Sequence, residues 1–148
     1  MTDTTTTLEQ RLGRLEDLQA IHQLFIDYGH HLDSGDFASY AELFADEGEI
    51  MLGPMGRAKG RSEIEALMTK TLGGRPGQSF HLITSPVVEL NGDRATSEVM
   101  WTVLSRGDGG PPVVTMLGRH KDDLVREGGR WKFLRRRGFV DIPSTYED

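Results

Sequence analysis

The chain has 148 residues, of which 36% are hydrophobic and 27% charged, and this composition is typical of one soluble globular domain. Its formal net charge of −6 argues against nucleic acid as a partner, and it has no apolar run of about 18 residues that would span a membrane. The absence of cysteine excludes disulfides, thiolate catalysis and cysteine-ligated metals, and it fits a cytoplasmic protein.

Residues 1–7, MTDTTTT, are polar and predict a disordered N-terminal tail ahead of a single domain over residues 8–148. Apolar residues then recur at steps of three and four, which predicts a long amphipathic helix. They are Leu8, Leu12, Leu15, Leu18, Ile21, Phe25, Tyr28 and Leu32. Gly35 is expected to end this helix, and Asp36 to cap a second short helix, FASYAELFA, with inward aromatic side chains.

The next segments predict a strand and a third helix. EGEIMLGP is expected to be a short strand that ends at Pro54. Ser62 and Glu65 are spaced as a capping box that opens a helix, which ends near Gly73.

Four β-rich runs complete the chain: SFHLITSPVVEL, RATSEVMWTVLS, PVVTMLGRHKDDLVR and RWKFLRRRGFVDI. Good hairpin signals separate them, namely NGD, RGDGGPP and EGG. This order of elements predicts an α+β fold with three helices on one face of a strongly curved, mixed or antiparallel sheet. Such a sheet leaves a hollow at its open end.

Helical phasing separates the polar residues of the stretch YGHHLDSGD. At about 100° per residue, Tyr28 falls inside the apolar stripe and Asp33 on its shoulder. Gly29 lies in the same row as Asp33, one turn earlier, and leaves space there. In the alternative interpretation, Asp33 only ends the helix and Tyr28 is a core aromatic residue with its hydroxyl satisfied.

Two histidines on predicted strands are candidate partners for Asp33. His81 shares a face with Ile83, and His120 shares a face with Met116 and Gly118. Considered alone, a histidine on a strand is usually structural or exposed, and this is the alternative interpretation for both. No local ligand spacing joins His22 or these histidines to Asp33, so no metal site is predicted.

Two further strand segments carry candidate residues. Strand alternation places Arg136 with Lys132 and Leu134, opposite Trp131 and Phe133, and Arg136 is the member of RRR favoured for the pocket. The remaining arginines are expected to be exposed. Val99, Trp101 and Val103 share a strand face and are candidates for a subunit contact, with core packing as the alternative.

Several segments together resemble the SnoaL-like branch of the nuclear transport factor 2-like superfamily. They are LEDLQAIHQLFIDYGHHLDSGDFASYAELFADEGEI, the FH pair at position 80 and GRWKFLRRRGFVDI, so the resemblance extends from about Leu8 to Ile142. It implies a cystatin-like, cone-shaped α+β barrel in which long helices pack on a strongly bent sheet. This fold hosts unrelated activities, so it does not fix the function.

Within the superfamily, the motifs are most similar to scytalone dehydratase, bile acid 7α-dehydratase and hexachlorocyclohexane dehydrochlorinase. The resemblance implies a catalytic pair of Asp33 and His81, which are 48 residues apart, with Tyr28 as an electrophile. The implied reaction is cofactor-free acid–base elimination from a small, mostly apolar cyclic, polyketide-like or steroid-like substrate. Candidate substrate-binding residues are His120, Arg136, Met116, Phe25 and Trp101.

Three alternatives stay open at this point. The same pair of residues would serve an isomerase or a cyclase, which differ in where the proton returns. A third alternative is a non-catalytic protein that binds a small ligand. In each case a homo-oligomer is expected, because one side of such a sheet is apolar and uncovered in a monomer. The resembling dehydratases form trimers and other relatives form dimers, so the number of copies stays open.

Overall fold

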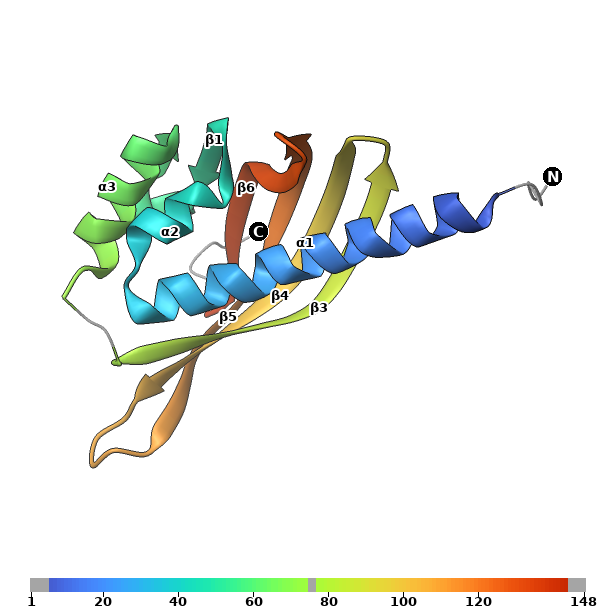
Figure 1. Cartoon of the computed structure of the whole chain (residues 1–148). Coiled ribbons are helices and arrows are strands. Elements are labelled where there is room, and N and C mark those ends of the chain that lie inside the picture. The colour runs from blue at the N-terminus through green and yellow to red at the C-terminus, as the bar shows by residue number, and fades with distance from the viewer. Residues whose placement is uncertain (1–5, 75–76, 144–148) are drawn as a thin grey trace.

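The computed structural model describes residues 6–74 and 77–143. Three α-helices pack on a six-stranded sheet, with α1 running across it and α2 and α3 beside its β1 end (Figure 1). The helices are α1 (Leu8–Ser34), α2 (Phe37–Glu42) and α3 (Arg61–Leu72), with a short 3₁₀ helix at Gly53–Met55. The strands are β1 (Phe44–Met51), β2 (Arg57–Lys59), β3 (Ser79–Asn91), β4 (Arg94–Arg106), β5 (Pro112–Glu127) and β6 (Arg130–Ile142).

The sheet has the strand order β2-β1-β6-β5-β4-β3 and does not close into a full barrel. The last four strands form the predicted antiparallel meander, whereas β1 pairs with β6 in parallel, so the sheet is mixed. The predicted α+β class with three helices on a curved sheet is therefore confirmed. The strand expected to end at Pro54 ends at Met51 instead, because Pro54 lies in the 3₁₀ helix.

The helix ends follow the capping signals with one exception. Gly35 ends α1 in the left-handed conformation at φ 75°, and the Asp36 carboxylate accepts the Ser39 N–H at 3.1 Å, as expected. The predicted Ser62–Glu65 capping box is wrong. The helix α3 begins two residues earlier than that box requires, with Gly60 as its N-cap, and no side chain caps it.

Thr7 and Gln10 form a capping box at the start of α1, and residues 1–5 of the predicted N-terminal tail lie outside the described residues. The apolar stripe of α1 enters the core only from Ile21 onward, where its side chains pack with Phe44 and Phe133. Its first turns extend past the sheet (Figure 1), and Leu8, Leu12 and Leu15 are exposed there. No helix in residues 6–74 and 77–143 is long and apolar enough to cross a membrane.

Val99, Trp101 and Val103 lie on the inner face of β4 and are buried. The prediction that they form a subunit contact is therefore wrong, because their side chains are buried within the chain itself, with Val99 in the hydrophobic core. Core packing, the alternative, holds. The apolar residues of the opposite face are exposed instead, among them Phe80, Leu82 and Met100.

Candidate active site

The C-terminal half of α1 packs directly against β3. A Cβ atom at Gly29 would lie 3.5 Å from Cγ1 of Ile83 and 3.8 Å from the carbonyl oxygen of His81. The helix and the strand therefore approach closely at this glycine. Asp33, one turn further along the helix, consequently faces His81.

Asp33 and His81 form a closely bonded pair. Oδ1 of Asp33 lies 2.8 Å from Nδ1 of His81, and the backbone N–H of His81 donates to Oδ1 at 3.0 Å and to Oδ2 at 3.2 Å. Both side chains are 18% exposed. Because a carboxylate can only accept, Nδ1 of the neutral imidazole carries the proton and Nε2 keeps a lone pair. Asp33 therefore does more than end the helix, which Gly35 already does.

Tyr28, on the same helix as Asp33, is buried, and its hydroxyl accepts a hydrogen bond of 2.8 Å from the hydroxyl of Tyr40. The Tyr28 proton is thus free to be donated elsewhere. Burial raises the pKa of Tyr28, and the Arg136 guanidinium only partly opposes this effect. At neutral pH the phenol is therefore protonated and able to donate. Tyr40 was predicted to face inward, but no local signal in the sequence identified it as a partner of Tyr28.

His120 lies on β5 between two aromatic rings. Its ring centroid is 5.5 Å from that of Tyr28 and 5.9 Å from that of Trp101. Burial, followed by the positive charge of Arg136, holds the pKa of His120 well below its usual value of 6.5. This histidine is therefore neutral at neutral pH, and its buried Nδ1 has no hydrogen-bond partner among residues 6–74 and 77–143.

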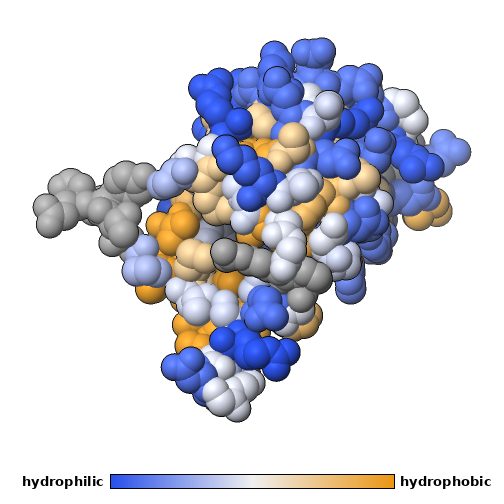
Figure 2. Space-filling view, turned by 90° about the vertical axis from the view of Figure 1, so that its left-hand side faces the viewer, coloured by the Kyte–Doolittle hydropathy of each residue, from blue (hydrophilic) through white to orange (hydrophobic). Residues whose placement is uncertain are grey.

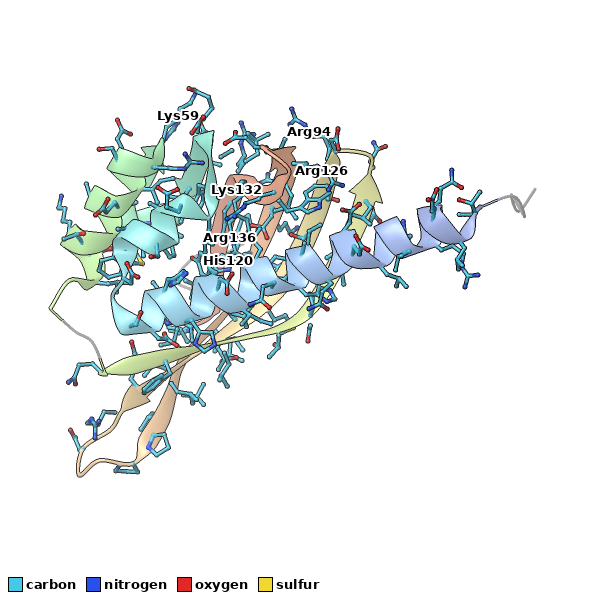
Figure 3. All side chains as sticks on the ribbon, viewed as in Figure 1. Lys59, Arg94, His120, Arg126, Lys132 and Arg136 are labelled. Carbon is cyan, nitrogen blue, oxygen red and sulfur yellow. The ribbon has the colours of Figure 1, made fainter. Side chains whose placement is uncertain are left out.

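Arg136 is the buried arginine of the RRR segment, as favoured, and its side chain has no exposed surface (Figure 3). Strand alternation predicted that Arg136 lies on the face opposite Trp131 and Phe133. This prediction is wrong, because Arg136 shares the inner face with both residues. The register shifts between the pairs Asp123–Arg135 and Leu124–Phe133, so an irregularity at Leu134 reverses the alternation. Arg135 and Arg137 are exposed, as expected.

The Arg136 guanidinium binds the Asp122 carboxylate on one of its sides. Nε and Nη2 of Arg136 donate to the Asp122 carboxylate at 2.9 and 3.3 Å, and Oγ of Ser97 donates to the same carboxylate at 2.9 Å. On its other side, the guanidinium lies 4.1 Å from the centre of the Tyr28 ring. Strand alternation puts Asp122 on the face of His120, but no local signal in the sequence shows that it pairs with Arg136.

The remaining candidate substrate-binding residues differ in how deeply they are buried. Trp101 is buried on the inner face, and its Nε1 has no partner. Met116 pairs in register with Val103 and is partly exposed. Phe25 lies in the core, 6.3 Å from the Phe133 ring, rather than at an accessible surface.

The surroundings of the site differ from the charged surface elsewhere. Figure 2 shows apolar and weakly polar side chains gathered around a hollow on the face at the C-terminal end of α1, below the strongly polar surface of α3. A separate groove of about 640 Å³ is lined by charged residues such as Glu49, Asp123 and Arg135, and it includes neither member of the Asp33–His81 pair. We place the candidate site at the buried contacts, because acid–base groups act most strongly where water is restricted.

No group of three or more His, Asp or Glu side chains among residues 6–74 and 77–143 is arranged to share a metal ion. The chemistry that the described geometry supports is acid–base chemistry. It comprises an imidazole oriented by Asp33 and, in a second set of contacts, a protonated phenol beside a buried cation.

The SnoaL-like domain family matches residues 13–137. The chain belongs to this family. None of the curated proteins matches it in sequence. Solved structures that are similar to this SnoaL-like domain include a nuclear transport factor 2-like protein with a cystatin-like fold from Novosphingobium aromaticivorans. That protein is 28% identical with a TM-score of 0.84, over 98% of this chain and 95% of that one.

Two further structural neighbours of the SnoaL-like domain are named for elimination reactions. One, from the same organism, carries a provisional assignment as a scytalone dehydratase and is 23% identical, with a TM-score of 0.73 over 91% of both chains. The other is a type 2 hexachlorocyclohexane dehydrochlorinase that is 20% identical, with a TM-score of 0.78 over 93% of this chain and 96% of that chain. At these identities the similarity establishes the fold alone.

Proposed function

We propose that the protein is a cofactor-independent lyase that eliminates water from a small, mostly apolar substrate of the cyclic, polyketide or steroid type. The observation that carries this proposal is the 2.8 Å contact between Oδ1 of Asp33 and Nδ1 of His81. It orients a neutral imidazole so that Nε2 is available as a base, beside a phenol that is free to donate.

In the proposed reaction, Nε2 of His81 removes a proton from a carbon next to a carbonyl group. The electron pair of that C–H bond forms a C=C bond, and the hydroxyl group on the neighbouring carbon departs. Tyr28 protonates the departing hydroxyl, so that it leaves as water. The imidazolium of His81 then loses its proton and Tyr28 regains one, which restores both groups.

Asp33 supports this reaction by stabilising the imidazolium that forms on His81. The carboxylate is fixed by three contacts, two of them from the His81 backbone N–H, so it needs no reorganisation when the charge appears. Two structural neighbours named for eliminations, a provisionally assigned dehydratase and a dehydrochlorinase, share the fold of this chain, which supports the proposal. An isomerase would share the first step and return the proton to another carbon.

We also propose that the protein works in the cytoplasm as a homo-oligomer of two or three copies. The support is the outer face of the sheet, where Phe80, Leu82 and Met100 are 55%, 47% and 44% exposed. Leu82 and Met100 are diagonal neighbours on the paired strands β3 and β4, so these side chains form a continuous apolar area.

The proposal is tested with a panel of cyclic β-hydroxyketones, in which dehydration to a conjugated enone is followed by ultraviolet absorbance. We expect His81→Gln to lower kcat by about 100-fold or more, because a general base contributes roughly that factor. Glutamine can still donate to Asp33, so the unfolding temperature and the circular dichroism spectrum should be preserved. The exposed His22 provides the control His22→Gln, which should keep full activity. A folded His81→Gln variant with unchanged kcat would show that His81 is not the base.

A further inference from the structure

Three buried side-chain nitrogens on the inner face of the sheet have no hydrogen-bond partner. They are Nε1 of Trp101, Nδ1 of His120 and Nη1 of Arg136. Buried polar groups are nearly always paired, since an unpaired group loses its hydration without compensation. These are the only such side-chain atoms found in residues 6–74 and 77–143. Their occurrence in one region therefore calls for a ligand or a buried water.

The three residues occupy diagonal positions on three neighbouring strands. Trp101 pairs directly with Gly118, so His120 lies two residues further along β5. His120 pairs directly with Gly138, so Arg136 lies two residues before that position on β6. This displacement keeps Trp101, His120 and Arg136 on the same face of the sheet. The residues at the direct positions are glycines. The Trp101 indole packs over Gly118, and the His120 ring lies 3.5 Å from the Cβ position of Gly138.

Contacts through Tyr28 connect the three residues into one group. The Trp101 and His120 rings are 5.9 Å apart, the His120 and Tyr28 rings are 5.5 Å apart, and Cζ of Arg136 lies 4.1 Å from the centre of the Tyr28 ring. The group thus borders the phenol that faces the leaving group in the proposed reaction.

The chemistry of these atoms selects the kind of ligand atom they bind. An indole N–H and a guanidinium can only donate, and Nδ1 of a neutral histidine can donate in one of its two tautomers. Asp122 occupies Nε and Nη2 of Arg136 and leaves Nη1 without a partner. Donors next to a buried positive charge favour an acceptor atom with negative charge, such as a carbonyl oxygen that becomes an enolate.

We propose that Trp101, His120 and Arg136 form a subsite that binds the carbonyl oxygen of the substrate and its enolate. The substrate is accordingly a ketone or another carbonyl compound that enters with its oxygen toward β4–β6, leaving the adjacent C–H for His81. This assignment deepens the proposed function and rests on it for the role of His81, whereas binding of the oxygen can be measured without turnover.

The test compares 4-nitrophenolate, an aromatic oxyanion, with nitrobenzene, which lacks the oxygen, at mildly alkaline pH. We expect the unaltered protein to bind 4-nitrophenolate at least about tenfold more tightly, and Trp101→Phe to remove most of this preference. Trp131→Phe is the matched control, because the Nε1 of Trp131 is bonded to Asp17 at 3.1 Å. This control variant should keep the preference.

A second measurement uses the unaltered protein and does not depend on the folding of a variant. The chain contains two tryptophans, so its ¹⁵N-labelled indole spectrum has two N–H resonances, which Trp131→Phe assigns. The Trp101 resonance should move downfield with 4-nitrophenolate and not with nitrobenzene, while the Trp131 resonance stays in place. Equal affinities for the two probes, with no movement of the Trp101 resonance, would mean that these atoms hold a buried water only and would overturn the subsite.

The subsite and the proposed function fail in distinguishable ways. His81→Gln should keep the preference for 4-nitrophenolate, because His81 is not one of the three donors. If that variant also keeps full turnover, the lyase mechanism is wrong while the subsite stands. If the unaltered protein shows no preference and His81→Gln still loses turnover, the subsite is wrong while the base assignment stands.

Discussion

Replacing Asp122 by asparagine would remove the counter-charge of an arginine that has no access to solvent. Both side chains of the Asp122–Arg136 pair are fully buried. Burial raises the pKa of Asp122, although Arg136 and hydrogen bonds from Ser97 and Arg136 oppose this effect. The desolvation of the carboxylate therefore outweighs its attraction to the guanidinium. A variant without the carboxylate is consequently unstable mainly because the Arg136 charge is left alone in the interior.

The size of this effect follows from the geometry. At 2.9 Å between Nε and Oδ1, the attraction is roughly 6 kcal/mol with an effective dielectric constant of about 20. Asparagine retains one acceptor for Arg136, and the Tyr28 and Phe133 rings remain 4.1 and 4.3 Å from Cζ. Breaking one partner of a buried pair usually costs about 3–5 kcal/mol. With these remaining contacts, we expect Asp122→Asn to lower the free energy of unfolding by about 3 kcal/mol.

The assay is urea unfolding followed by tryptophan fluorescence, with Asp123→Asn as the control. Asp123 is the next residue of β5, has its side chain on the opposite face and is not fully buried, so its substitution should change stability by less than about 0.5 kcal/mol. The double variant Asp122→Leu, Arg136→Met should recover most of the lost stability, because it leaves no unpaired charge. A loss below about 1 kcal/mol for Asp122→Asn would refute the stranded-charge argument.

Two further predictions concern His120 and Gly118. Because the pKa of His120 lies well below 6.5 in the folded protein, only the unfolded chain gains its proton as the pH falls below that value, so wild-type stability declines. His120→Gln should remove up to about 1.4 kcal/mol of this decline per pH unit in urea unfolding between about pH 7 and 5.5, and an unchanged slope would contradict it. A Cβ at Gly118 would overlap the Phe139 carbonyl oxygen and the Trp101 indole, so Gly118→Ala should lose about 1–3 kcal/mol. Gly13→Ala, which meets no atom within 4 Å, should instead gain up to about 1 kcal/mol, and equal effects of the two changes would refute the packing argument.

Local periodicity was sufficient to find the part of the site that lies on α1. Tyr28 and Asp33 were distinguished from the neighbouring histidines by their angle around the helix, which depends on a few adjacent residues. The partner of Asp33 was not local. Its selection as His81 came from the resemblance to a family, because periodicity shows which face of a strand a histidine occupies but not which helix covers that face.

Nonlocal pairing explains what the sequence did not reveal. Strand alternation placed Arg136 opposite Phe133, and one irregularity at Leu134 puts both on the inner face. The parallel pairing of β1 with β6 joins segments more than 80 residues apart, with Phe44 opposite Phe133. The Tyr40–Tyr28 hydrogen bond likewise depends on how α2 folds back on α1, which neither helix encodes by itself.

Tyr28 links the two halves of the proposed site and limits how they can work. Its hydroxyl accepts from Tyr40, while its ring contacts His120 and the Arg136 guanidinium. Arg136 lowers the free energy of a negative charge on Tyr28, yet burial still keeps its pKa raised, so the phenol stays protonated until a substrate group takes its proton. The same buried cation favours an enolate at the proposed subsite. In the proposed reaction, one charge would thus stabilise both negative oxygens of the elimination, which gives the buried Asp122–Arg136 pair a role beyond stability.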